Sequence, residues 1–111
     1  MTQKQKYSLE FVKIKHPEFS DSYISNSSSN IPGSGILSDL LTILSNREPQ
    51  YLLDEINLAL NGGNYEEYYT PDGGISGSIK ISPPNVSING FIIKLSDLKQ
   101  LLQEWIVFIK L

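Results

Sequence analysis

The chain has 111 residues, a formal net charge of −3 and no cysteine. This length suits one domain that buries its core without metals or disulfides, so we expect a single domain over residues 1–111. The absence of cysteine excludes disulfides, a thiolate nucleophile and cysteine-ligated zinc. The N-terminus lacks the apolar segment of a signal peptide, and no apolar run reaches the roughly 20 residues of a membrane span. We therefore expect a cytoplasmic protein without a membrane partner.

Charge is unevenly distributed along the chain. Residues 1–16 carry four lysines and one glutamate, and residues 80–111 carry four lysines and two acidic residues. Residues 17–79, by contrast, carry nine acidic residues and a single arginine. Binding to phosphates needs clustered Lys and Arg, so the acidic centre argues against direct nucleic-acid binding. It favours a basic protein partner.

The N-terminal part predicts one strand followed by a long loop. Residues 7–14 (YSLEFVKI) begin with apolar side chains at alternate positions, as in a strand. Residues 16–35 are dominated by serine, asparagine, glycine and proline, which predicts a mobile loop. Phe19, Tyr23 and Ile24 are its only expected anchors to the body of the protein.

Two helices joined by a short connection are expected next. Residues 36–46 carry Leu and Ile at helical spacing, and Ser34 is a suitable N-cap. Residues 48–63 place Pro49 in a first turn and Gly62 where a glycine would end the helix. The short connection favours an antiparallel helix pair.

The most specific local signal is Asn89-Gly90, the preferred pair for a two-residue β-hairpin turn. Such a turn sets Ile88 opposite Phe91, and it places four apolar side chains on one face of the hairpin. These are Val86, Ile88, Phe91 and Ile93.

The last segment, residues 96–111, predicts a helix with Ser96 as its N-cap and an apolar stripe that includes Trp105. Residues 64–70 and 75–82 have the composition of further strands. The expected fold class is α+β. We expect a single domain with one antiparallel sheet that includes the N-terminal strand, a helix pair, and a C-terminal helix packed on the sheet.

No set of residues predicts catalysis. His16 is the only histidine, whereas a zinc site needs three or four ligands. The PGSG motif at 32–35 lacks the spacing and the lysine of a phosphate-binding loop. The adjacent acidic pairs at 54–55 and 66–67 point to different sides of a helix or strand, and the serines have no base to activate them. We therefore expect no enzymatic activity, no metal and no cofactor.

The stretch GGNYEEYYTPDGG, residues 62–74, concentrates tyrosine and acid and admits two interpretations. It can be an edge strand, because tyrosine suits strands and glutamates on an edge discourage aggregation. It can also be a binding surface, because tyrosine is enriched at interface hot spots and carboxylates pair with Arg and Lys. The candidate partner-binding residues are Tyr65, Glu66, Glu67, Tyr68, Tyr69 and Asp72, with contributions from Asp54, Glu55, Asp21 and Tyr23.

The segment EEYYTPDGGISGSIKISPPNVSINGFIIKLSDLKQLLQEWIVFI resembles small immunity proteins of bacterial contact-dependent growth inhibition and related polymorphic toxin systems. The resemblance covers roughly residues 65–109, and no invariant residue carries over from it. It implies a cytoplasmic protein without catalytic residues that binds and blocks a cognate toxin domain, commonly a basic nuclease. The alternative is a small-ligand-binding or regulatory accessory domain, which requires an apolar pocket with a few converging polar groups.

Overall fold

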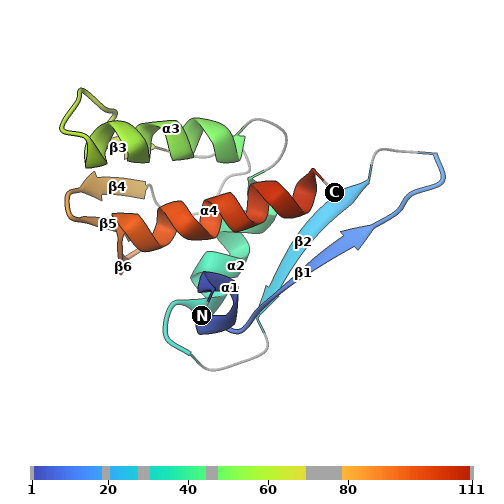
Figure 1. Cartoon of the computed structure of the whole chain (residues 1–111). Coiled ribbons are helices and arrows are strands. Elements are labelled where there is room, and N and C mark those ends of the chain that lie inside the picture. Colours follow the sequence, from blue (N-terminus) through green and yellow to red (C-terminus); the bar gives the residue numbers. More distant parts are fainter. Residues whose placement is uncertain (1, 19–20, 28–30, 45–47, 70–78, 111) are drawn as a thin grey trace.

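The chain folds as a single α+β domain in the computed structural model, which describes residues 2–18, 21–27, 31–44, 48–69 and 79–110 (Figure 1). The expected fold class is confirmed. Within these residues the elements, in chain order, are α1 (Gln3–Lys6), β1 (Leu9–Ile14), β2 (Ser22–Ser27), α2 (Ser34–Ile43), α3 (Glu48–Leu60), β3 (Tyr68–Tyr69), β4 (Ile79–Ser82), β5 (Asn85–Ile88), β6 (Phe91–Lys94) and α4 (Leu95–Ile109).

The hairpin at Asn89-Gly90 has the predicted register. Both turn residues have positive φ, 50° for Asn89 and 88° for Gly90, as a type I′ turn requires. Ile88 pairs with Phe91 and Val86 with Ile93. The four side chains are buried or partly buried, whereas Ile92, on the opposite face, is 65% exposed. This hairpin forms half of an antiparallel sheet in the order β3-β4-β5-β6.

The expectation of one sheet that includes the N-terminal strand is wrong. β1 pairs instead with β2, antiparallel, from Leu9 opposite Ser27 to Ile14 opposite Ser22, and the two strands form a separate ribbon. In Figure 1 this ribbon extends away from the helices as an arm. The expected loop over residues 16–35 therefore contains a six-residue strand, and Tyr23 and Ile24 lie within it.

The polar strand β2 is held in place by side chains of α2. The backbone N–H of Ser25 donates to the Thr42 hydroxyl at 3.0 Å, and the Ser25 carbonyl accepts from the hydroxyls of Ser38 and Thr42. The outer edge of β2 is thus satisfied by a helix rather than by another strand. Because a strand edge presents unpaired N–H and C=O groups, this contact removes the need for a third strand there.

The two central helices exist as predicted but pack on different partners. α3 packs chiefly against α4, and α2 chiefly against β2, so the expected antiparallel pair is not the main contact. At the end of α3, Gly62 has φ of 73°, and the N–H of Gly63 donates to the Leu58 carbonyl at 2.8 Å. Gly62 therefore terminates α3 in a left-handed conformation, as the sequence predicts.

Neither Ser34 nor Ser96, the two serines expected as N-caps, is the N-cap of its helix. Ser34 is the first residue of α2, after Gly33, and its buried hydroxyl donates to the Tyr7 carbonyl at 2.6 Å. That bond ties the start of α2 to the chain before β1. α4 begins at Leu95, directly after β6, so Ser96 lies one residue inside the helix.

The short helix α1 is attached to α4 through Glu104. The Glu104 carboxylate accepts the backbone N–H groups of Gln3 at 3.0 Å and Lys4 at 2.9 Å. Thr2 caps the next free N–H, that of Gln5, at 3.0 Å. The first N–H groups of a helix have no partner within it, so a carboxylate at this end both satisfies them and fixes the position of the helix.

The core lies between α4, the four-stranded sheet and helices α2 and α3. Trp105 of α4 is fully buried, and its ring lies 4.9 Å from that of Phe11 and 5.7 Å from that of Phe108 (distances between ring centroids). At the other end of the core, Phe91 packs directly over Gly33, where an added Cβ would lie 2.2 Å from the phenyl ring. Aromatic side chains thus pack β1 against α4, and a separate aromatic contact packs β6 against the residue before α2.

Candidate protein-binding surface

The exposed side of α3 carries one part of the acidic material singled out in the sequence. Leu52, Leu53 and Ile56 face the core, which leaves Tyr51, Asp54 and Leu58 exposed on the opposite side at spacings of three and four residues. Tyr51 is 55% exposed and Leu58 is 42% exposed. Glu55 lies beside them and is half-buried.

Glu55 connects α3 to the segment that leads into β3. Its carboxylate accepts the backbone N–H of Glu66 at 2.8 Å. This bond brings together the two acidic pairs of the sequence, which are eleven residues apart. Asp54 and Glu66 are both exposed, and the Asp54 carboxylate accepts a hydrogen bond from the Gln50 side chain at 2.9 Å. No partner for the Glu66 carboxylate is found within the described residues.

The strand β3 covers only Tyr68–Tyr69 of the strand expected over residues 64–70, but it is the edge of the four-stranded sheet, as the plainer interpretation of the sequence predicts. Tyr68 pairs with Lys80 across the strands and is 57% exposed. The Lys80 ammonium lies 3.8 Å from the Glu67 carboxylate and 5.7 Å from the centre of the Tyr68 ring. Because all three side chains are largely exposed, this pairing adds little stability and leaves the side chains available to a partner.

We use the name acidic tyrosine surface for a group of side chains on α3 and on residues 66–68, which lead into β3. Its members are Tyr51, Asp54, Glu55, Glu66, Glu67 and Tyr68. The sequence analysis missed Tyr51. Its position three residues before Asp54 and four before Glu55 on a helix was the signal that could have placed it there.

Other predicted site residues lie differently. Tyr65 and Tyr69 are partly buried and pack against the core, so they are less accessible to a partner than Tyr51 and Tyr68. Asp21 pairs with Lys13 at 3.3 Å and Tyr23 contacts the Phe108 ring, both at the β1-β2 ribbon. Figure 1 places that ribbon and β3 on opposite sides of the molecule, so these two residues do not join the acidic tyrosine surface. Asp72 lies outside the described residues.

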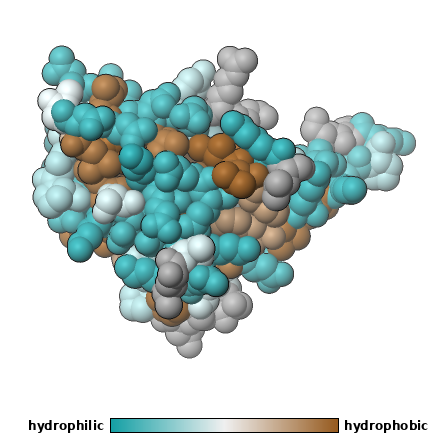
Figure 2. Space-filling model, in the orientation of Figure 1, coloured by the Kyte–Doolittle hydropathy of each residue, from teal (hydrophilic) through white to brown (hydrophobic). Residues whose placement is uncertain are grey.

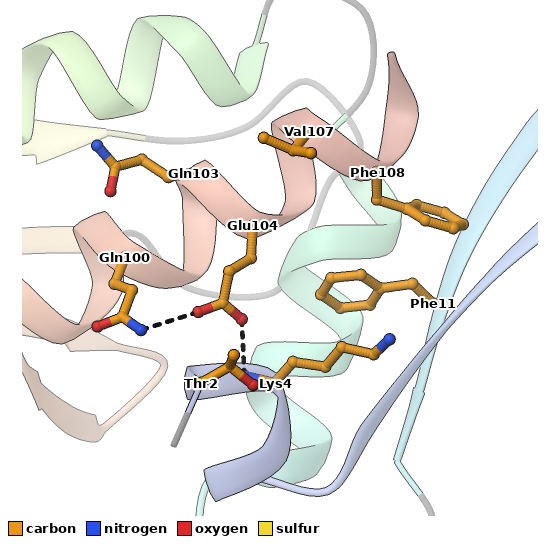
Figure 3. Close-up of a pocket in the computed structure, with 8 residues that line it drawn as sticks. All are labelled: Thr2, Lys4, Phe11, Gln100, Gln103, Glu104, Val107 and Phe108. Carbon is orange, nitrogen blue, oxygen red and sulfur yellow. Dashed lines mark hydrogen bonds between the residues drawn. The ribbon is translucent and has the colours of Figure 1, made fainter. Parts of the chain in front are cut away.

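A second feature is an open groove of about 530 Å³ between α1, β1 and α4 (Figure 3). Phe11, Val107 and Phe108 form its apolar part, and Lys4 lies at its side. The polar group at its base, the Glu104 carboxylate, is already occupied by the two α1 amides and by the Gln100 side chain, at 3.1 Å. The remaining polar side chains of the lining, which include Lys4 and Gln103, lie around an open and mainly apolar depression, so the groove gives little support to the ligand-binding alternative.

Within the described residues, no group of three or more His, Cys, Asp or Glu side chains is arranged to hold a metal ion. No helix in that part of the chain has the length and apolar character needed to cross a bilayer. No protein-family model matches the chain, and neither the curated proteins nor the solved structures contain a significant match.

Proposed function

We propose that this chain is an immunity protein that binds a basic toxin domain through the acidic tyrosine surface and covers the toxin's active site. The observation that carries the proposal is the position of Glu66. Its amide donates to the Glu55 carboxylate of α3, while Glu66 itself is exposed two residues before the exposed Tyr68. The resemblance of residues 65–109 to immunity proteins supports the same function.

Inhibition by this surface needs no chemistry from the protein. A nuclease active site binds phosphates through Lys and Arg, and exposed carboxylates can pair with the same groups. Carboxylates seated there would occupy the space that substrate phosphates otherwise fill. The proposed inhibitor is therefore a competitor for the substrate site, and its acidic centre matches a basic nuclease.

Charge and aromatic contacts have separate roles in this proposal. The carboxylates increase the rate of association, and that rate falls as salt rises, because charges on the surface are screened beyond about 8 Å at physiological ionic strength. Tyr51 and Tyr68 are large, exposed and flanked by acids. Truncation of a tyrosine at the centre of an interface costs about 2 kcal/mol or more, whereas a glutamate at the rim mainly alters the association rate.

The proposal is tested by co-expression with the toxin-bearing reading frame adjacent to the gene. We expect Glu66→Lys/Glu67→Lys to lose protection against that toxin, because two repulsive charges replace two attractive ones. Glu10→Lys/Asp39→Lys is the matched control, since it reverses the same number of exposed acids on β1 and α2. Circular dichroism and thermal melting of both variants establish that they are folded.

Three outcomes would contradict parts of the proposal. Full protection by folded Glu66→Lys/Glu67→Lys would show that these residues only keep the strand edge soluble. Equal loss of protection in both double variants would show a dependence on total charge. If no toxin gene is adjacent and no basic protein co-purifies, the immunity function should be abandoned for the ligand-binding or regulatory alternative.

A further inference from the structure

Some backbone groups of β1 point toward its free side, away from β2, as the contacts of β2 establish. Ser25 directs its N–H and C=O away from β1 and toward α2, so Ser25 and its partner Phe11 form a non-hydrogen-bonded pair of the ribbon. The N–H and C=O of Phe11 therefore also point away from β2, along the free edge of β1. Alternation along the strand gives Leu9 and Lys13 the same orientation.

Nothing in the described part of the chain pairs with these groups. No strand other than β2 lies beside β1, and no side chain there bonds the backbone of Phe11 or Lys13. Among the described residues the two edges of the ribbon thus differ, because α2 satisfies the edge of β2 whereas no element pairs with the edge of β1. An open edge is a template for another extended backbone.

The groove adjoins this edge. Phe11, whose backbone groups point outward, also turns its side chain into the groove, beside Phe108 of α4 (Figure 3). Val107, which also lines the groove, is 62% exposed. Figure 2 shows apolar surface over the C-terminal half of α4 that continues toward the base of the ribbon. An extended chain beside β1 would therefore direct alternate side chains into an apolar depression.

The charges around the site favour an acidic occupant. Lys4 lies at the side of the groove, with its ammonium 5.0 Å from the centre of the Phe11 ring, and Lys13 and Lys15 follow on β1 and just beyond it. Lys4 and Lys15 have no carboxylate partner among the described residues, whereas Lys13 pairs with Asp21. The Glu104 carboxylate already accepts hydrogen bonds from two α1 amides and from the Gln100 side chain.

We propose that the free edge of β1 binds an extended acidic segment of a partner protein as an added strand. Phe11 and Lys13 form the backbone hydrogen bonds, and the segment places one large apolar side chain between Phe11, Val107 and Phe108. Its carboxylates face Lys4 and Lys15. The site is built from α1, β1 and α4, so it is independent of the acidic tyrosine surface and of the proposed immunity function.

A display library of random twelve-residue peptides provides the probe. The full chain selects binders, and the strongest are synthesised and measured by fluorescence anisotropy. We expect an apolar residue flanked by Asp or Glu in the selected peptides. Val107→Asp should weaken binding about tenfold or more, because it places a charge in the groove and repels the peptide. Ile92→Asp is the matched control, since Ile92 is equally exposed on the four-stranded sheet.

Amide hydrogen exchange separates strand addition from simple adhesion. In the free protein the N–H groups of Phe11 and Lys13 should exchange rapidly, whereas those of Val12 and Ile14, paired with β2, should be protected. Peptide binding should protect Phe11 and Lys13. Selected peptides that are basic, that ignore Val107→Asp, or that leave both amides unprotected would overturn the proposal. So would protection in the free protein accompanied by a dimer in sedimentation, because a second copy would then occupy the edge.

Discussion

The indole N–H of Trp105 donates a hydrogen bond to the backbone carbonyl of Leu44, at 3.2 Å, and both residues are buried. Leu44 is the C-cap of α2, and the carbonyls at the end of a helix have no N–H donor within that helix. The bond therefore satisfies two polar groups at once and links α4 to the end of α2 across the core.

Two substitutions of Trp105 should separate packing from hydrogen bonding. Trp105→Ala removes a fully buried ring and should lower the free energy of unfolding by about 3–5 kcal/mol. Trp105→Phe keeps much of the ring but leaves the Leu44 carbonyl unpaired, for a smaller loss of about 1–3 kcal/mol. Urea denaturation followed by circular dichroism measures both. Equal stability of Trp105→Ala and the wild type would place the indole outside the core.

Gly33 should not tolerate alanine. Its φ of 83° is unfavourable for residues with a Cβ by about 1–2 kcal/mol, and that Cβ would collide with the Phe91 ring. We expect Gly33→Ala to destabilise the protein by more than the backbone term alone. Gly35→Ala is the control, because Gly35 lies in α2 with open space around it, and alanine there should stabilise the helix slightly. Thermal melting compares the two, and equal melting temperatures would contradict the contact.

Loss of the Thr42 hydroxyl should loosen the β1-β2 ribbon. Thr42→Val preserves shape but leaves the Ser25 N–H without its acceptor, which should cost about 1–3 kcal/mol. Thr42→Ser retains the hydroxyl and should keep the Ser25 amide protected. Hydrogen exchange at Ser25 reports the effect directly. Slow exchange at Ser25 in folded Thr42→Val would show that α2 does not hold this edge.

Glu104 should anchor the N-terminal helix. Glu104→Gln removes the charge and one of the two acceptor oxygens that receive the Gln3 and Lys4 amides, so we expect a loss of about 1–2 kcal/mol. The amides of Gln3 and Lys4 should then exchange faster, while those of the four-stranded sheet do not change. Gln100→Ala removes only the side-chain donor to Glu104 and is the control. Unchanged exchange at both α1 amides would refute this anchoring.

Local pattern by itself determined the α+β class, α3 with its glycine stop, α4 with buried Trp105, and the register of the Asn89-Gly90 hairpin. These features follow from the spacing of apolar residues and from turn chemistry within about fifteen neighbouring residues. The edge position of β3 and the exposure of Glu66 and Tyr68 follow from the same local signals.

Tertiary contacts alone decided the strand β2 and the separation of two sheets. The hydrogen bonds of β2 are made with β1 and with Ser38 and Thr42 of α2. Because the strand itself is polar, no hydrophobic periodicity within residues 22–27 predicts it. Tertiary contacts also decided the hydrogen bond from the Glu66 amide to the Glu55 carboxylate, which links the two parts of the acidic tyrosine surface. They likewise placed Tyr23 against Phe108 in the β1-β2 ribbon, on the side of the molecule opposite β3. Such pairings depend on which segments meet in space, and a sequence pattern reports only what lies within one segment.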